Sequence, residues 1–194
     1  MKGDAILKRL TREESRAMTR ERLLGAATQL FRRDGYASTS VERIADEAGF
    51  SKGAVYSNFD SKEAIFLAVL DQQGQDSLDP LLAAIDAAPD FTQIIDLLVV
   101  WADDRSASGI WSLTILEHAR LAGPEAQSLA RQREILLGHW RQLGERVATR
   151  LPHMDAPPDT IGALLHEIAY APALTFMGRP KAGELMRLAL TRWI

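Results

Sequence analysis

Apolar residues recur at helical spacing along nearly the whole chain, and Pro or Gly stands between the periodic segments. In residues 19–34 they fall at i, i+1, i+4, i+7 and i+8, on one face of a helix: Leu23, Leu24, Ala27, Leu30 and Phe31. Gly35 should end this helix, because glycine is common just after a helix C-terminus. Long alternating β-branched runs, which would indicate strands, do not occur. The pattern therefore predicts an all-α protein.

Two short helices are predicted next. Thr39 and Glu42 have the three-residue spacing of a capping box, so a second helix should begin there. Its buried side would comprise Val41, Ile44, Ala45 and Ala48. Ser51 should cap a third helix, in which only Val55 and Phe59 are apolar anchors. A helix with so little apolar surface leaves most of its outer face free.

The remaining predicted helices are longer. A fourth should begin at Asp60 or Ser61 and fray near residues 72–77, QQGQDS, which form the best candidate domain boundary. Further helices are expected at 91–104, at 109–122, from Pro124 to just before Pro152, at 159–177 and at 181–193. The helix at 91–104 is apolar on nearly all sides, so it should be buried.

The spacing of Ala45, Gly49 and Val55 is that of a helix-turn-helix. Alanine lets the two helices approach closely, and glycine adopts the backbone angles of the turn without a Cβ penalty. The later apolar residue packs the second helix onto the first. In DNA-binding proteins with this motif, the outer face of the second helix enters the major groove.

Residues 19–66, TRERLLGAATQLFRRDGYASTSVERIADEAGFSKGAVYSNFDSKEAIF, closely resemble the DNA-binding domain of TetR-family transcriptional regulators. The resemblance is specific because LFRRDGY, TSVERIADEAG, SKGAVYSNF and SKEAIF occur in order. It implies an all-α fold with an N-terminal three-helix helix-turn-helix domain at residues 19–66. An arm at residues 1–18 would precede it, and residues 67–194 would form a helical domain that binds an effector and dimerises.

The resemblance also implies which residues contact double-stranded DNA: Thr39, Ser40, Ser51, Lys52, Gly53, Ala54, Tyr56, Ser57, Asn58 and Lys62. Two of them depart from the family pattern. Many relatives have threonine in place of Ala54, and an aromatic residue or histidine in place of Ser57. Fewer direct base contacts are therefore expected, with more weight on DNA shape and on a thymine-methyl contact. Upstream, Lys8, Arg9, Arg12 and Arg16 form either an arm along the DNA or a solvated tail.

Composition narrows the class of protein. The chain has 194 residues, of which 46% are hydrophobic, and it has no cysteine, so disulfides and thiolate metal sites are excluded. Its net charge is −3, but residues 1–63 carry 12 Lys and Arg against 10 Asp and Glu. This balance of +2 is consistent with one end that faces a polyanion. No apolar run is long enough for a signal peptide or a membrane span, so we expect a cytoplasmic protein with no membrane partner.

Large side chains are frequent in the C-terminal part. A candidate pocket for a small apolar or aromatic effector comprises Trp101, Trp111, Ile115, His118, Trp140, Tyr170 and Met177. Glu117 and His166 are further candidates for its polar groups. For any one of these residues, packing in the core is the alternative.

Catalytic and metal-binding patterns are missing. The pairs Glu117-His118 and His166-Glu167 are adjacent rather than four residues apart, and no nucleophile-elbow, zincin or phosphate-loop motif occurs. We expect no cofactor, no metal and no enzyme activity.

A single short recognition helix reads few base pairs, so a homodimer on a palindromic operator is expected, paired through the last two helices. Its residues there would include Ile161, Leu164, Leu165, Ile168, Leu185, Leu188, Ala189 and Trp193. The favoured function is a repressor that an effector releases from DNA. The alternatives are an activator, a regulator without a ligand, and a helical interaction module whose DNA-binding end is vestigial.

Overall fold

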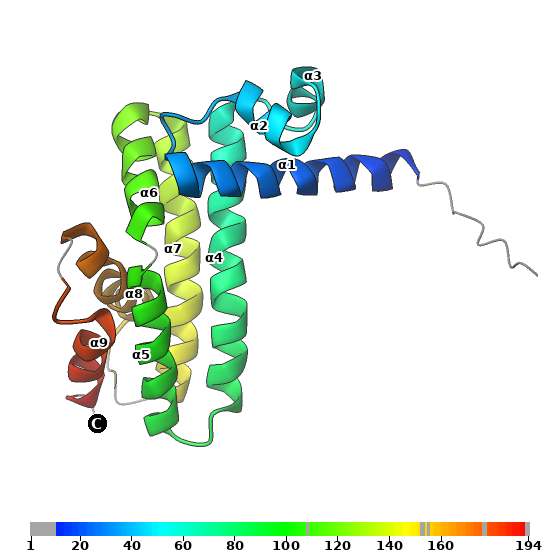
Figure 1. The fold of residues 1–194 in the computed structure, drawn as a ribbon. Coiled ribbons are helices and arrows are strands. Elements are labelled where there is room, and N and C mark those ends of the chain that lie inside the picture. Colours follow the sequence, from blue (N-terminus) through cyan, green and yellow to red (C-terminus); the bar gives the residue numbers. More distant parts are fainter. Residues whose placement is uncertain (1–10, 108, 152–153, 155, 176–177, 193–194) are drawn as a thin grey trace, which may run out of the picture.

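The computed structural model describes residues 11–107, 109–151, 154, 156–175 and 178–192. Within these residues the chain forms nine α-helices and no strand, which confirms the all-α prediction (Figure 1). The helices are α1 (Arg12–Asp34), α2 (Val41–Ala48), α3 (Lys52–Tyr56), α4 (Lys62–Ala87), α5 (Phe91–Ala107), α6 (Gly109–Ala122), α7 (Gln127–Arg150), α8 (Pro158–Thr175) and α9 (Ala182–Thr191). None of the described helices is long and apolar enough to cross a bilayer.

The helices form two units that share α4. Figure 1 shows α1 lying across one end of the long helices α4 and α7, with α2 and α3 on the far side of α1. We call α1–α3 with residues 62–70 the head, and the described residues from 71 onward the body. Each unit has its own hydrophobic core, and Trp111 and Ile115 of α6 pack against the core of the head.

Aromatic rings fill the centre of the head. Phe31 of α1 stacks on Tyr36 at 5.9 Å and meets Phe66 of α4 edge-on at 5.5 Å. All three residues are buried. These contacts tie the C-terminal end of α1 to the start of α4.

The first helix begins earlier than predicted. α1 begins seven residues before Thr19, because Thr11 and Glu14 form a capping box. Residues 12–18, assigned to an arm, are therefore helical. Of Thr39 and Ser40, either of which the sequence allows as the cap of the second helix, Ser40 is the N-cap of α2, and its hydroxyl accepts from the backbone N–H of Arg43.

The predicted fraying of the fourth helix at residues 72–77 is wrong, because α4 continues to Ala87 with Pro80 inside it. Tertiary packing holds this polar stretch in the helix. Gly74 lies directly against the His139 imidazole of α7, where a Cβ would overlap the ring. The Ser77 hydroxyl accepts from the indole N–H of Trp101 at 3.1 Å.

Two predictions about the later helices also need correction. α7 begins at Gln127 rather than at Pro124, because Gly123 has φ +83° and residues 124–126 form a turn. The helix at 91–104 is not buried all round, since Val100 of α5 is 62% exposed. Its inner face, with Ile94 and Leu98, is buried as expected.

The body is held together by a very close crossing of α7 and α8. A Cβ on Gly144 would overlap the carbonyl oxygen of Pro158, and one on Gly162 would overlap that of Trp140. Only glycine allows the two backbones to approach so closely. α4 packs against α7, and α4, α5 and α9 supply most of the remaining core of the body.

Candidate functional site

The short helix α3 is the first functional element. The Ser51 hydroxyl caps it by accepting from the N–H of Ala54, as predicted. Val55 is fully buried and Phe59 nearly so, and these two side chains anchor the segment to the head. Gly49 has φ +73°, a left-handed conformation that favours glycine, and its N–H reaches the carbonyl of Ala45.

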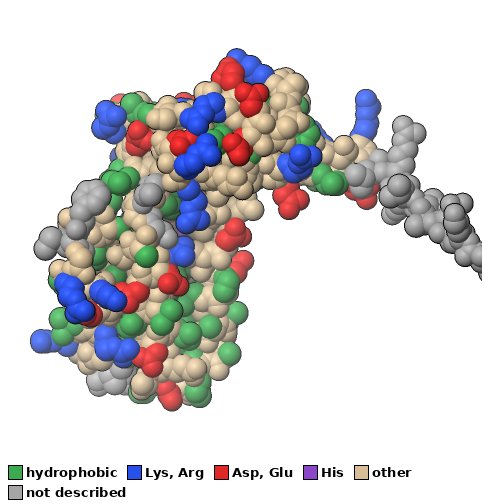
Figure 2. Space-filling model, in the orientation of Figure 1, with side chains coloured by type: hydrophobic (Ala, Val, Ile, Leu, Met, Phe, Trp, Pro, Cys, Tyr) green, Lys and Arg blue, Asp and Glu red, His purple; other side chains and the backbone are tan. Residues whose placement is uncertain are grey.

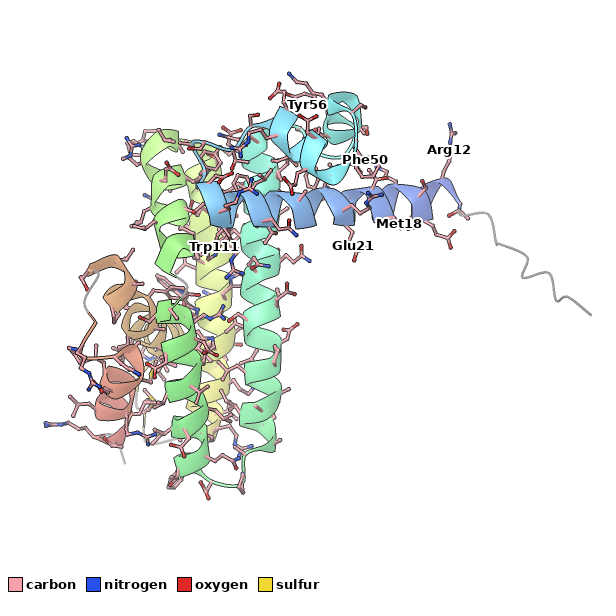
Figure 3. The ribbon with its side chains drawn as sticks, in the orientation of Figure 1. Arg12, Met18, Glu21, Phe50, Tyr56 and Trp111 are labelled. Atoms are coloured by element: carbon pink, nitrogen blue, oxygen red, sulfur yellow. The ribbon has the colours of Figure 1, made fainter. Side chains whose placement is uncertain are left out.

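The outer surface of α3 is open. Tyr56 is 48% exposed, and Figure 3 shows it at the outer end of the head, away from the body. Lys52, Gly53 and Ser57 are also exposed, whereas Ala54 and Asn58 are half-buried. The Asn58 amide donates to the carbonyl of Ala54 at 2.8 Å, so its side chain lies back along the helix.

Arginines of α1 support this segment from beneath, which the sequence analysis did not anticipate. Arg16 donates to the Ser57 carbonyl at 3.0 Å, and Arg20 donates to the Asn58 carbonyl at 2.8 Å. The Arg20 guanidinium also lies 4.0 Å from the centre of the Phe59 ring. The four-residue spacing of Arg16 and Arg20 was the available signal, because it places both on one face of α1.

Lys52 is held by an acidic neighbour. Its ammonium forms an exposed ion pair with Glu42 of α2. The hydrogen bond from Lys52 lowers the pKa of Glu42 to about 2, and the same contact raises the pKa of Lys52. The visible face of the head in Figure 2 likewise shows basic and acidic side chains mixed together.

Two other residues predicted to contact DNA, Lys62 and Thr39, bond to the loop between α1 and α2 instead. Lys62 donates to the carbonyls of Tyr36 and Thr39, each at 3.0 Å, and burial lowers its pKa. Thr39 is 1% exposed and donates its hydroxyl to the Gly35 carbonyl. Ser40, half-buried, lies at the N-terminus of α2. Lys62 and Thr39 therefore shape the loop that supports α2.

The second functional element is a cavity of about 320 Å³ in the body. Of the predicted pocket residues, the structure brings five together around it: Trp101, Trp111, Ile115, Trp140 and Tyr170. Met177 lies outside the described residues. Side chains from α4, α5, α6, α7 and α8 line the cavity, and Arg32 of α1 reaches it from the head. Figure 3 shows Trp111 directly beneath α1, at the junction of the two units.

His118 does not line this cavity. It is fully buried in the junction, where its ring lies 4.5 Å from that of Phe66 and 4.9 Å from that of Tyr36. Its Nδ1–H donates to the side-chain carbonyl of Gln132 at 2.5 Å, and burial lowers its pKa. The imidazole is therefore neutral near pH 7 and joins α6, α7 and the head.

Glu117, the neighbour of His118 on α6, makes the second connection across the junction. Its carboxylate accepts from the backbone N–H groups of Tyr36 and Ala37, at 2.7 and 3.1 Å. α6 therefore contributes to the cavity wall through Trp111 and holds the head through Glu117.

The cavity also contains polar groups that the sequence analysis missed. Arg105, Ser112 and His139 line it. His166, which was considered as a polar pocket residue, donates Nδ1–H to the carbonyl of Gly162 at 3.0 Å, and burial lowers its pKa to about 4. The only signal for Arg105 in the sequence was its position one helical turn after Trp101. Among the described residues, no cluster of three or more metal-ligating side chains occurs.

Comparisons with known proteins agree with this arrangement. The family model described as bacterial regulatory proteins of the tetR family matches residues 23–69. The uncharacterised regulator YerO of Bacillus subtilis is 45% identical over 49 residues, which cover 25% of this chain but only 17% of that protein. The structure of the multidrug-binding protein EbrR superposes with a TM-score of 0.72 at 22% identity, covering 96% of this chain and 97% of EbrR.

The transcriptional regulator RutR of Escherichia coli K12 matches a longer part of the chain. It is 33% identical over 149 residues, which cover 70% of this chain and 68% of RutR. This match is much longer than residues 19–66, so it extends well beyond the helix-turn-helix. The chain belongs to the TetR family of DNA-binding transcriptional regulators, which are not enzymes.

Proposed function

We propose that this protein is a homodimeric repressor that a small apolar or aromatic effector releases from a palindromic operator. The observation that carries the proposal is the exposed outer face of α3, in a head that α4 and α6 connect to a cavity in the body. Residues 19–66 would bind DNA, and residues 67–194 would bind the effector and dimerise, with the change of unit falling inside α4. The protein would act in the cytoplasm.

The proposed DNA contacts are chosen by which side chains of the head are exposed. Lys52, Gly53 and Tyr56 lie on the outer face of α3, where they can approach the major groove, with Ala54 and Asn58 partly accessible beside them. Ser40, Ser51 and Ser57 would contact phosphates or base edges near the helix ends. Thr39 and Lys62 have their polar groups engaged by the loop, so their roles would be to position α2.

Dimerisation is supported by apolar side chains that the chain leaves uncovered. Leu164 of α8 and Leu188 of α9 are 38% and 56% exposed. Ile161 and Leu165, also expected at the interface, are buried in the body instead. Trp193 lies outside the described residues. Two copies paired through α8 and α9 would present two α3 helices to successive major grooves, about 10 base pairs apart.

Release from DNA would be a population shift. An effector in the cavity changes the spacing of the two heads only if it binds one conformation of the body more tightly than the other. α6 is suited to transmit that difference, because Trp111 lines the cavity and Glu117 holds the backbone of the head.

A gel-shift assay with the DNA upstream of the gene tests the proposal. Lys52→Glu should abolish the shift, because it removes a phosphate-directed cation and adds a negative charge. Arg133→Glu, the same charge reversal at an exposed position of α7, should leave the shift unchanged. A Lys52→Glu protein that still shifts the DNA would contradict the assignment of α3.

A reporter gene under that upstream DNA separates a repressor from an activator. Removal of the regulator should raise expression, whereas a fall would identify an activator. Sedimentation at micromolar concentration should show a dimer, and a monomer alone would contradict the paired α8 and α9 helices.

A further inference from the structure

The cavity is apolar on most sides but contains two polar atoms without a protein partner. The Nε of Arg105 and the hydroxyl of Ser112 are buried, and neither makes a hydrogen bond among the described residues. Ser112 is only 6% exposed, and both residues line the cavity. Buried polar groups in proteins are nearly always paired, since an unpaired one costs about 1–3 kcal/mol. A bound molecule would supply the missing partner.

The chemistry of these atoms indicates a negatively charged partner. A guanidinium only donates hydrogen bonds and is always charged, so it requires an acceptor and is best satisfied by an anion. The Ser112 hydroxyl, which lines the same cavity, can also donate to an anionic ligand. With one half-buried cation in an apolar cavity, a single negative charge such as a carboxylate matches better than a multiply charged group.

A positively charged ligand fits less well, although aromatic cavities often bind cations. The carboxylates that line the cavity, Asp76 and Glu167, are both exposed to solvent. The imidazole of His166 is buried and already donates to a backbone carbonyl. The guanidinium of Arg105 bonds to the Tyr170 hydroxyl, but its Nε is buried without a partner, so the open hydrogen-bonding position belongs to a cation.

The aromatic lining of the cavity favours a planar ligand. Trp101 and Tyr170 both pack against His166, the first edge-on at 5.3 Å and the second stacked at 6.0 Å. Trp111 and Trp140 complete the aromatic lining. Aromatic side chains prefer offset-stacked and edge-to-face contacts, so an aromatic ring is the ligand that these surfaces favour. A volume of about 320 Å³ lies at the small end of the range for ligand sites.

We propose that the cavity binds a planar aromatic carboxylate, whose ring lies among the tryptophans and whose carboxylate pairs with Arg105 and Ser112. This inference rests on the proposed effector function and makes the effector class specific: an acid rather than a neutral or cationic aromatic compound. The ion pair with Arg105 would replace water around the carboxylate and satisfy both orphan donors together.

Binding of three matched probes to the full-length protein, without DNA, tests the charge preference. Naphthoate, naphthamide and the naphthylmethylammonium ion share one ring system and differ in charge. Three of the four tryptophans of the chain line the cavity, so intrinsic fluorescence reports binding directly. Naphthoate should bind about ten- to a hundredfold more tightly than the other two.

Two variants locate the anion site. Arg105→Gln should weaken naphthoate binding to the level of naphthamide, whereas Arg131→Gln, at an exposed ion pair of α7, should not. Ser112→Ala should weaken naphthoate binding about fivefold without lowering Tm, because the hydroxyl has no partner to lose. Isothermal calorimetry and circular dichroism of each variant separate lost binding from lost folding.

Three results would overturn the inference: tighter binding of the amide or the cation, no binding of naphthoate, or an unchanged preference in Arg105→Gln. A lower Tm for Ser112→Ala would overturn the role of that hydroxyl. The proposed function has a separate readout. If naphthoate binds as expected but the operator shift persists in its presence, the anion site stands and effector-driven release fails.

Discussion

The head and the body present their functional surfaces in opposite ways. In the head, α3 lies on the outside, and Arg16 and Arg20 support its C-terminal end from beneath. In the body, where α7 and α8 cross at very short distance, α4 to α8 line a cavity in which Arg105 and Ser112 have unpaired polar atoms. An external site needs a rigid support, because its partner approaches from solvent. An internal site needs space and unsatisfied groups, which only a tightly constrained frame can maintain.

The largest expected effect on stability comes from disrupting the close packing of α7 against α8. Gly144→Ala should reduce the free energy of unfolding by at least about 3 kcal/mol, because the added methyl overlaps the backbone carbonyl of Pro158 rather than a movable side chain. Gly138→Ala, on the same helix with open space around it, should instead stabilise by about 0.5–1 kcal/mol. Urea unfolding followed by circular dichroism measures both. Equal small changes would show that α7 and α8 separate easily.

A somewhat smaller effect should come from the buried imidazole of the body. The pKa of His166 is about 4 in the folded protein, because burial disfavours its charged form, and near 6.5 when unfolded. Below pH 6.5 the unfolded chain binds the proton first, so stability falls as the pH drops from 6.5 to 4 and this contribution levels off below 4. The loss through His166 should be about 3 kcal/mol.

His166→Asn retains a donor near Gly162 without titrating, so it should make the stability profile less steep between pH 6.5 and 4. The remaining slope would include the contribution of His118, whose pKa is also lowered by burial. The carboxylates with lowered pKa values, such as Asp34 and Asp159, lose their contributions only as the pH falls below their ordinary values, so they act in a lower range. Chemical denaturation at a series of pH values distinguishes the two ranges. A variant with the wild-type slope would rule out His166 as the source.

The smallest effect should come from the surface of the head. Glu42→Gln removes the ion pair that competes with DNA for Lys52, so operator affinity should rise about two- to fivefold. Glu134→Gln breaks a comparable exposed pair with Arg131 in the body and should leave affinity unchanged. Fluorescence anisotropy with labelled operator gives both values. Lower affinity in Glu42→Gln would mean that Glu42 itself contributes to binding, through a base or by orienting Lys52.

The predictions from the sequence were most accurate for features that depend on residues close together in the chain. Ser51 caps α3, Val55 and Phe59 anchor it, and Gly49 adopts the left-handed turn, because each depends on neighbours within a few residues. The capping box of Thr11 and Glu14 is also local, but the predicted first helix began after it, at residue 19. Residues 72–77 were misassigned because their polar composition suggests a loop, while the packing partners that keep them helical are distant in sequence.

The sequence by itself determined the helices, the helix-turn-helix and the exposed face of α3, because periodicity and capping are set by residues close together in the chain. The tertiary structure alone decided the rest of the site. It placed His118 in the junction, made Glu117 a link to the head and left Arg105 and Ser112 without partners. Whether a buried polar atom is paired depends on what the other helices bring beside it, and no local pattern contains that information.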